Sequence, residues 1–379
     1  MKTALLHYWL TNMRGGEKVL AALGEMLPDA DIFTHAFGKG MREKGEGGWY
    51  EGNGTSGSWK GHRVTESFIA RLPLGRKHPQ AYLPLMPVAT RSLKLDGYGL
   101  IVSSESGPIK GIRKPKGVRH VCYCHTPMRY LWDMHDEYYR SAGFGGKLAM
   151  KLFTGYLRKE DLKSAEAVDD FVANSAFVAE RIRRIYGRES TVVHPPVDVD
   201  FFGASIQCPH PAGLEPKSYY LYAGELRDYK RPDLAVEACL RMGRKLVVVG
   251  NGKMRESLTR RIDEKGEIIF LGRVSDEGLR SVFANARALL FPGVEDFGIV
   301  PVEAQAAGTP VIALGRGGAL ETVRGGETGV FFSDPTAESL CEAIETFEGC
   351  SWNPEACRRN AARFSSVAFK SKMQSVLPC

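Results

Sequence analysis

The stretch from Phe291 to Gly318, FPGVEDFGIVPVEAQAAGTPVIALGRGG, contains the start of a short helix in a form suited to bind an anion. An apolar run of strand length ends at its first residue, and Pro301 stands in a helix-starting position, where a missing N–H costs nothing. The backbone N–H groups at the helix start are expected to be unpaired and to point outward from the carboxyl end of a parallel strand. They belong to Phe297, Gly298, Ile299 and Val300. A phosphate-bearing ligand fits this chemistry, and residues 315–318 are expected to let a backbone approach it.

Two carboxylates, Glu295 and Glu303, flank this helix start, with seven residues between them. Taken alone, each has a structural explanation. Glu303 can complete a capping box or compensate the helix dipole, and Glu295 can be a solvated turn residue. Because both lie beside the expected anion site, ligand binding is the alternative role for each of them.

A second phosphate site is expected after the strand at residues 219–223. That strand is followed by a glycine turn and a basic helix start that includes Arg227, Lys230 and Arg231. Lysine offers phosphate a mobile point charge, and arginine offers a planar fork of donors. For the two arginines, a solvated charge cluster is the alternative.

Two further features stand at strand ends in the first half of the chain. Gly15 and Gly16 separate an apolar strand from an expected helix through Leu27, which is where a doubly wound domain receives phosphate; a bare turn is the alternative. The pair is not G-x-G-x-x-G, so the fingerprint of a dinucleotide oxidoreductase is missing. His125 follows the buried strand 119–124, and Arg129, four residues later, is a candidate to hold an acidic or hydroxylated acceptor.

The acidic turn followed by GIVPVEAQAAGTPVIA and Gly-Gly resembles the donor-site signature of retaining, two-domain GT-B glycosyltransferases of family 4. The resemblance covers nearly the whole chain and is strongest over residues 219–330. It implies that Glu295 lies by the donor sugar hydroxyls, that Glu303 holds the ribose of a sugar nucleotide, and that Lys230 is the diphosphate lysine. It also implies that the loop at Gly15 and Gly16 closes over the diphosphate.

For His125, the resemblance implies contact with the donor sugar across the interdomain cleft. The family arginine of the diphosphate site is Glu225 here, so that either Arg227 or Arg231 replaces it or the leaving group is held more weakly. The resemblance is greatest to bacterial mannosyltransferases of polysaccharide and O-antigen assembly. It therefore implies GDP-mannose as the donor, a retaining reaction and no metal cofactor.

The β-α alternation predicts an α/β protein, and with the resemblance a GT-B fold of two Rossmann-like doubly wound parallel-sheet domains. A chain of 379 residues is long enough for two cores of roughly 150 to 200 residues. The stiff Pro195-Pro196 pair marks the boundary. An acceptor-side domain is expected at 1–194, together with a crossover helix at about 358–379, and the donor-binding domain at 195–357.

The cysteines and a D-x-D triplet give no evidence for a metal. Cys122 and Cys124 alternate on one strand without a second ligand pair, and buried strand thiols explain them better than a metal site or disulfides. The triplet from Asp198 to Asp200 follows the proline pair, where a turn is expected. The N-terminal apolar run is too short for a secretory signal, which indicates a cytoplasmic protein.

A formal net charge of +7 suits anionic ligands, an anionic membrane or nucleic acid. The glycine-rich segment 38–61 is expected to be a long mobile loop facing the acceptor. Residues 144–165 predict a basic amphipathic helix, which can cover a core or lie on the inner face of the cell membrane. Nucleic-acid binding through segment 38–61 ranks last because the sequence has no base-reading module.

The predicted function is transfer of a hexose from a sugar nucleotide to a glycan, either an oligosaccharide or a lipid-linked one, in cell-surface polysaccharide assembly. Transfer from a UDP- or ADP-sugar and sugar epimerisation are alternatives within enzymes. A sugar-nucleotide-binding scaffold without turnover is the alternative outside them, and Glu225 is the residue that favours it.

Overall fold

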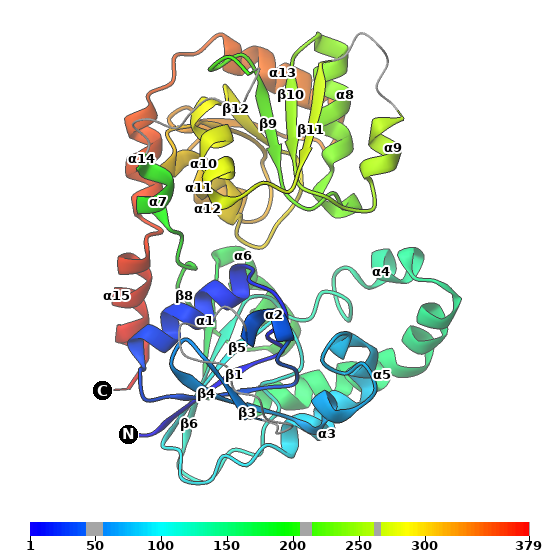
Figure 1. The fold of residues 1–379 in the computed structure, drawn as a ribbon, viewed down its shortest axis with the longest axis vertical. Helices are drawn as coiled ribbons and strands as arrows, with labels where there is room; N and C mark the ends of the chain where they lie inside the picture. The colour runs from blue at the N-terminus through cyan, green and yellow to red at the C-terminus, as the bar shows by residue number, and fades with distance from the viewer. Residues whose placement is uncertain (43–55, 205–213, 261–266, 379) are drawn as a thin grey trace. The chain divides into compact units, whose positions relative to one another are not determined.

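The computed structural model describes residues 1–42, 56–204, 214–260 and 267–378. The chain forms two compact units, which are considered separately (Figure 1). Unit 1 consists of Met1–His194 and Lys370–Cys379, and unit 2 is Pro195–Phe369. Unit 2 thus extends further along the chain than residue 357, where the sequence analysis ended the donor domain.

Unit 1 is built on a sheet in which seven described strands run parallel and β3 pairs antiparallel with β4 at one edge. The spatial order is β3-β4-β2-β1-β5-β6-β7-β8. The strands are β1 (Thr3–His7), β2 (Asp31–Thr34), β3 (Ser56–Trp59), β4 (His62–Glu66), β5 (Leu100–Glu105), β6 (Arg119–Cys124), β7 (Asp170–Ala173) and β8 (Ser190–Val192).

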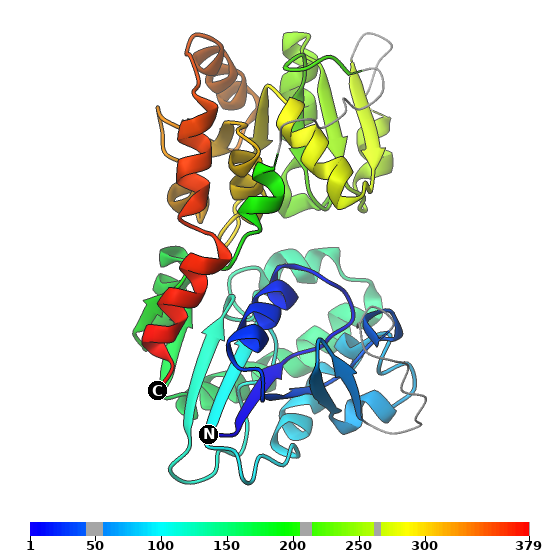
Figure 2. The ribbon, with the colours of Figure 1, turned by 60° about the vertical axis from the view of Figure 1, so that its left-hand side comes forward.

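The helices of unit 1 lie over both faces of this sheet (Figures 1 and 2). They are α1 (Gly15–Met26), α2 (Lys39–Arg42), η1 (Phe68–Arg71), η2 (Pro79–Leu85), α3 (Met86–Arg91), α4 (His135–Ser141), α5 (Phe144–Glu166) and α6 (Ala176–Tyr186), where η marks a 3-10 helix. Cys122 and Cys124 of β6 are buried free thiols that pack with α6, as the alternation along this strand predicted. The N-cap of α6 is Ser175, whose hydroxyl accepts the Val178 N–H.

Unit 2 has a six-stranded parallel sheet of order β11-β10-β9-β12-β13-β14 in its described residues. The strands are β9 (Tyr220–Ala223), β10 (Leu246–Val249), β11 (Ile268–Gly272), β12 (Ala288–Phe291), β13 (Val311–Leu314) and β14 (Gly329–Phe332). The helices are α7 (Val199–Gly203), η3 (Asp228–Lys230), α8 (Pro232–Met242), α9 (Arg255–Thr259), α10 (Asp276–Asn285), α11 (Ile299–Ala306), α12 (Ala319–Thr322), α13 (Ala337–Glu348) and α14 (Pro354–Ala362). A last helix, α15 (Ser366–Val376), begins in unit 2 and ends in unit 1.

The strands of unit 2 are apolar throughout because both faces of the sheet are covered. Along β9, Leu221 packs in a core beneath α10 and α11, whereas Tyr220 and Tyr222 pack in a second core beneath α8 and α13. The predicted fold class, two doubly wound parallel-sheet domains, is confirmed.

Both sheets have the strand order of a Rossmann fold, in which the chain starts at the centre and reverses direction once. The reversal lies between β1 and β5 in unit 1, and between β9 and β12 in unit 2. In such sheets, ligands bind outside the carboxyl ends of the two strands that flank this switch point. The loops after these four strands are therefore where a site is expected.

Two local predictions were wrong. The expected single C-terminal helix is two helices, because the Phe364 carbonyl turns to accept the Val197 N–H at 2.9 Å between α14 and α15. Segment 38–61 is not one loop, since β3 and the buried Trp59 extend the sheet of unit 1. The greater part of that segment, 43–55, lies outside the described residues. No helix in the described parts of the chain is long and apolar enough to cross a membrane.

Candidate functional site

The centre of unit 2's switch point is an ion pair between Lys230 and Glu295. Lys230 ends η3 in the loop after β9, and Glu295 lies in the loop after β12. The Lys230 Nζ lies 2.7 Å from Glu295 Oε1, and the side chains are 16% and 22% exposed. Two of the predicted site residues are therefore brought together where a ligand is expected. Both charges stay within reach of solvent.

Backbone packing brings the two loops together. A Cβ added at Gly293 would lie 2.7 Å from the Cα of Lys230, so only glycine allows this approach. On the other side, Gly317 has a φ of +66°, and a Cβ there would lie 2.6 Å from the Glu295 carbonyl oxygen. The N–H of Gly318 donates to that same oxygen at 2.9 Å. The glycines expected to approach a ligand thus approach the loop that carries Glu295.

The helix start beside this pair lies where it was predicted. Gly298 is the N-cap of α11 with φ +91°, and Ile299 and Val300 are the first helical residues, whose N–H groups have no partner within the helix. The side chain of Phe297 is buried and packs edge-on against Phe364, with ring centroids 5.4 Å apart. A backbone anion site next to Lys230 is therefore geometrically available.

Glu303 is the fifth residue of α11 and is 5% exposed. The capping-box alternative is wrong, because the third helical position, which that motif requires, is Pro301. A buried carboxylate is costly unless it is hydrogen-bonded, so a surface dipole role does not explain it either.

The two arginines proposed for the diphosphate are engaged by carboxylates in this ligand-free chain. Arg231 donates from Nε and Nη2 to Asp233, at 2.9 to 3.1 Å, and from Nη1 to the Pro335 carbonyl. Arg227 pairs with Glu225 at 2.8 Å. Glu225, which stands where the family has an arginine, therefore neutralises Arg227.

Unit 1 brings His125 together with the start of α1. His125 follows β6, and a Cβ added at Gly16 would lie 3.6 Å from its Nε2. Gly15 and Gly16 form the first turn of α1 rather than a separate turn before it. Burial, with His7 nearby, lowers the pKa of His125 to about 3, so the imidazole is neutral near pH 7.

A buried polar chain leads away from His125 on the α1 side of the sheet. The Nε2 of His125 lies 2.8 Å from Ser104 Oγ, and His7 Nδ1 lies 3.2 Å from the same oxygen. His7 Nε2 lies 3.7 Å from Glu17 Oε1 and has no hydrogen-bond partner among the described residues. Sequence analysis missed His7, Glu17 and Ser104, since only the register of β1 against β5 makes His7 and Ser104 neighbours.

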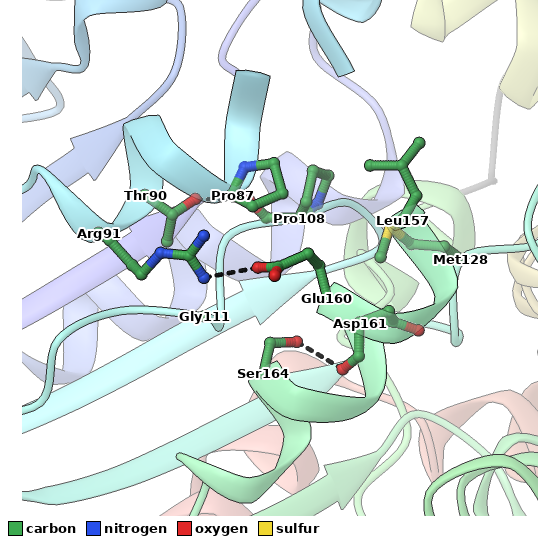
Figure 3. A pocket seen from close by; sticks show the side chains of 10 residues that line it. All are labelled: Pro87, Thr90, Arg91, Pro108, Gly111, Met128, Leu157, Glu160, Asp161 and Ser164. Carbon is green, nitrogen blue, oxygen red and sulfur yellow. Dashed lines mark hydrogen bonds and ion pairs between the residues drawn. The ribbon is translucent and has the colours of Figure 1, made fainter. Parts of the chain in front are cut away.

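Arg129 lies on the same loop as His125 and is partly exposed. The neighbouring Met128 lines a pocket of about 320 Å³ between α3 and α5, which the predicted site residues do not line (Figure 3). Arg91 and Glu160 pair within it at 2.6 Å. This pocket is therefore lined in part by a matched pair of charges.

No group of three His, Cys, Asp or Glu side chains that could hold a metal occurs in the described residues. The carboxylate of Asp198, the first residue of the D-x-D triplet, accepts the Phe201 N–H at 3.1 Å and caps α7. The triplet therefore begins a short helix instead of forming the turn expected there.

Comparisons with known proteins agree with the two-unit architecture. Residues 13–201 match the family model described as Glycosyltransferase Family 4, and residues 211–364 match that described as Glycosyl transferases group 1. A D-inositol 3-phosphate glycosyltransferase of Mycobacterium sp. (strain JLS) is 30% identical in an alignment 218 residues long, which covers 53% of this chain and 49% of that protein. The chain spans about half the length of the curated relatives it matches.

Among solved structures, the sucrose-phosphate synthase of Thermosynechococcus elongatus superposes with a TM-score of 0.71 at 20% identity, covering 99% of this chain and 98% of that one. The Anabaena protein HepE, solved in complex with UDP and glucose, gives a TM-score of 0.69 at 16% identity, covering 98% of each chain. At these identities the likeness concerns the fold, which is GT-B.

Proposed function

We propose, on the premise that the chain belongs to the family 4 type of GT-B glycosyltransferases, that it transfers a hexose from a sugar nucleotide to a glycan acceptor. The observation that carries the proposal is the Lys230–Glu295 pair at the switch point of unit 2, beside the start of α11. A cation and the N–H groups of a helix start suit a diphosphate, and the carboxylate suits sugar hydroxyls.

In this proposal the ligand-free ion pair separates when the donor binds. Lys230 turns from Glu295 to the diphosphate, together with the N–H groups at the start of α11, and Glu295 is released to accept hydrogen bonds from the hexose. Glu303 holds the ribose. Arg227 or Arg231 can assist only by giving up Glu225 or Asp233.

The transfer step breaks the bond between the anomeric carbon and the phosphate oxygen, and the electron pair leaves with the nucleoside diphosphate. The acceptor hydroxyl attacks the same face of the oxocarbenium-like sugar, and its proton passes to the departing phosphate oxygen. Lys230 and the α11 N–H groups stabilise the negative charge that develops there. His125, as a neutral imidazole, orients the hexose, while Gly15 and Gly16 lie over the diphosphate. No metal is assigned a part.

GDP-mannose is the proposed donor, following the sequence resemblance to mannosyltransferases. A UDP-sugar is the second candidate, since the fold matches that of HepE, which was solved with UDP and glucose. The acceptor is proposed to be an oligosaccharide or a lipid-linked glycan in cell-surface polysaccharide assembly, held in part by Arg129. Contact with an anionic membrane belongs to this proposal, as does a cytoplasmic location, which the six described free cysteines suit.

Two other functions compete with transfer. A non-catalytic scaffold is favoured by the Glu225–Arg227 pair, because it weakens the diphosphate site. An epimerase would use the same donor site without an acceptor.

Calorimetric titration with GDP, UDP, ADP and GDP-mannose tests the proposal, with product analysis of each sugar nucleotide by NMR. Selective GDP and GDP-mannose binding, with transfer of mannose to added glycan, is expected. Binding without turnover would favour the scaffold, and a changed sugar configuration would favour the epimerase. Failure to bind any of the four nucleotides would overturn a donor site in unit 2.

A further inference from the structure

Unit 1 carries a helical segment in which no residue is buried. Helix α4 has no buried residue, and none of residues 144–156 of α5 is buried, all of them within the described part of the chain. In Figure 1, α4 and the first turns of α5 extend outward from the body of unit 1. Only the second half of α5 is anchored, through Leu157, Asp161 and Ala165.

Large apolar side chains are concentrated on this exposed segment. Phe144, Leu148 and Leu152 are 88%, 49% and 64% exposed, and Phe153, Tyr156, Tyr138 and Tyr139 are exposed as well. Phe144, Leu148, Leu152 and Tyr156 recur every fourth residue and therefore lie along one stripe of the helix. A contiguous apolar surface of this kind marks an interaction site rather than ordinary scatter.

The charge of the same segment indicates what covers it. Residues 135–159 contain five lysines or arginines and two acidic side chains, Asp136 and Glu137, so the segment has a net positive charge. Lys151 and Lys159 are exposed and form no ion pair that the structure records. A second copy of the chain would bring like charges together on this surface, whereas an anionic bilayer would accept both the apolar side chains and the lysines.

We propose that α4 and residues 144–159 of α5 dock on the surface of an anionic lipid bilayer, with Phe144, Leu148 and Leu152 inserted at the interface and Lys151 and Lys159 beside lipid headgroups. This proposal specifies the protein surface and the lipid charge of the membrane contact that the proposed function includes. It rests on the proposed function only in that a lipid-linked acceptor gives the docking a purpose. Its test uses neither donor nor acceptor, so that a failure of docking is distinguishable from a failure of transfer.

The test is co-sedimentation of the full chain with vesicles of phosphatidylcholine, with and without phosphatidylglycerol. The variant L148Q/L152Q removes two inserted side chains while keeping good helix formers, and K151Q/K159Q removes two charges. Leu320→Gln is the matched apolar control, since Leu320 is 57% exposed on unit 2. K77Q/K94Q is the matched charge control, with both lysines exposed on unit 1.

Binding to phosphatidylglycerol vesicles is expected, with little binding to phosphatidylcholine alone. L148Q/L152Q should weaken it at least about tenfold, and K151Q/K159Q about fivefold per lysine. Both controls should bind as the unchanged chain does. Circular dichroism checks that the variants keep their helices.

Three outcomes would overturn the proposal. The first is no binding to anionic vesicles. The second is that L148Q/L152Q and K151Q/K159Q bind the vesicles as well as the unchanged chain does, or that the control variants lose as much binding as these two. The third is lipid-free self-association in sedimentation velocity that L148Q/L152Q abolishes, which would assign the surface to a second copy of the chain.

Discussion

The Nζ of Lys230 and the Oε1 of Glu295 lie 2.7 Å apart although 65 residues separate them in the chain. The pair joins the loops on the two sides of the switch point in unit 2. Each side chain neutralises the other in the ligand-free site, and both charges become available to a ligand when the pair separates. The first two predictions follow from this pairing.

Lys230→Ala should weaken binding of GDP and GDP-mannose by about 10- to 100-fold, because a charged hydrogen bond to phosphate contributes roughly 1.5 to 3 kcal/mol. Calorimetry measures the change. Lys245→Ala is a matched control, since Lys245 also pairs with a glutamate, Glu267, at 3.1 Å, but precedes β10 at its amino end. Equal effects of the two substitutions would remove Lys230 from the donor site.

Glu295→Gln should lower transfer by at least about 100-fold while leaving nucleoside diphosphate affinity unchanged or higher. The reason is that the substitution releases Lys230 from its partner without changing the shape of the side chain. Initial-rate kinetics and GDP titration separate the two effects. A parallel loss of GDP affinity would show that the carboxylate supports the loop rather than the sugar.

Ser104→Ala should reduce transfer with little change in GDP affinity, because it removes the hydroxyl that joins His125 to His7. The pH dependence of the rate should change too, as the His125 environment is altered. Ser103→Ala is the control: Ser103 is equally buried on the opposite face of β5, and its hydroxyl lies 2.8 Å from His120 Nε2. Each variant should lose about 1 to 3 kcal/mol of stability. Only the Ser104 variant should lose rate, and equal losses would reduce Ser104 to a structural role.

Unit 1 should lose stability in mild acid before unit 2. Burial lowers the pKa of His35 and of His120 to about 4, so the folded state takes up fewer protons than the unfolded state below pH 6.5. Above pH 6.5 both histidines are neutral in the folded and in the unfolded state, so their protonation does not change the free energy of unfolding. The free energy of unfolding falls as the pH drops toward 4, by about 2 kcal/mol per histidine at pH 5. Burial raises the pKa of Glu105, which offsets part of this loss in the same range.

Pulse proteolysis with peptide mapping at pH 7 and pH 5 can assign the loss to one unit. The one histidine in the sequence of unit 2 is His210, outside the described residues. His120→Gln should flatten the pH dependence of unit 1, and His78→Gln, at an exposed position, should leave it unchanged. Unfolding of unit 2 first, at pH 5, would contradict the assignment to buried histidines.

The local patterns of the sequence were enough to predict the β-α alternation and the start of α11, and the family resemblance added the two doubly wound units. They also predicted that residues 295 and 230 stand at strand ends, because strand order in a doubly wound sheet fixes which loops converge. They could not predict that Lys230 and Glu295 form a pair, or that His7 and Ser104 adjoin, since these contacts depend on register between distant strands. The break between α14 and α15 depends on Val197, which is equally remote in sequence.

The glycines at positions 293 and 317 determine how mutational data on this site should be interpreted. Both place the loop that carries Glu295 by backbone contact, Gly293 against Lys230 and Gly317 against the Glu295 carbonyl. Substitutions that shorten Lys230 or change Glu295 therefore test the chemistry of the site and leave this backbone arrangement in place. Adding a single methyl group at either glycine would displace the carboxylate. The position of the loop is thus tested by adding atoms at the two glycines, whereas the chemistry of the site is tested by removing them at Lys230 and Glu295.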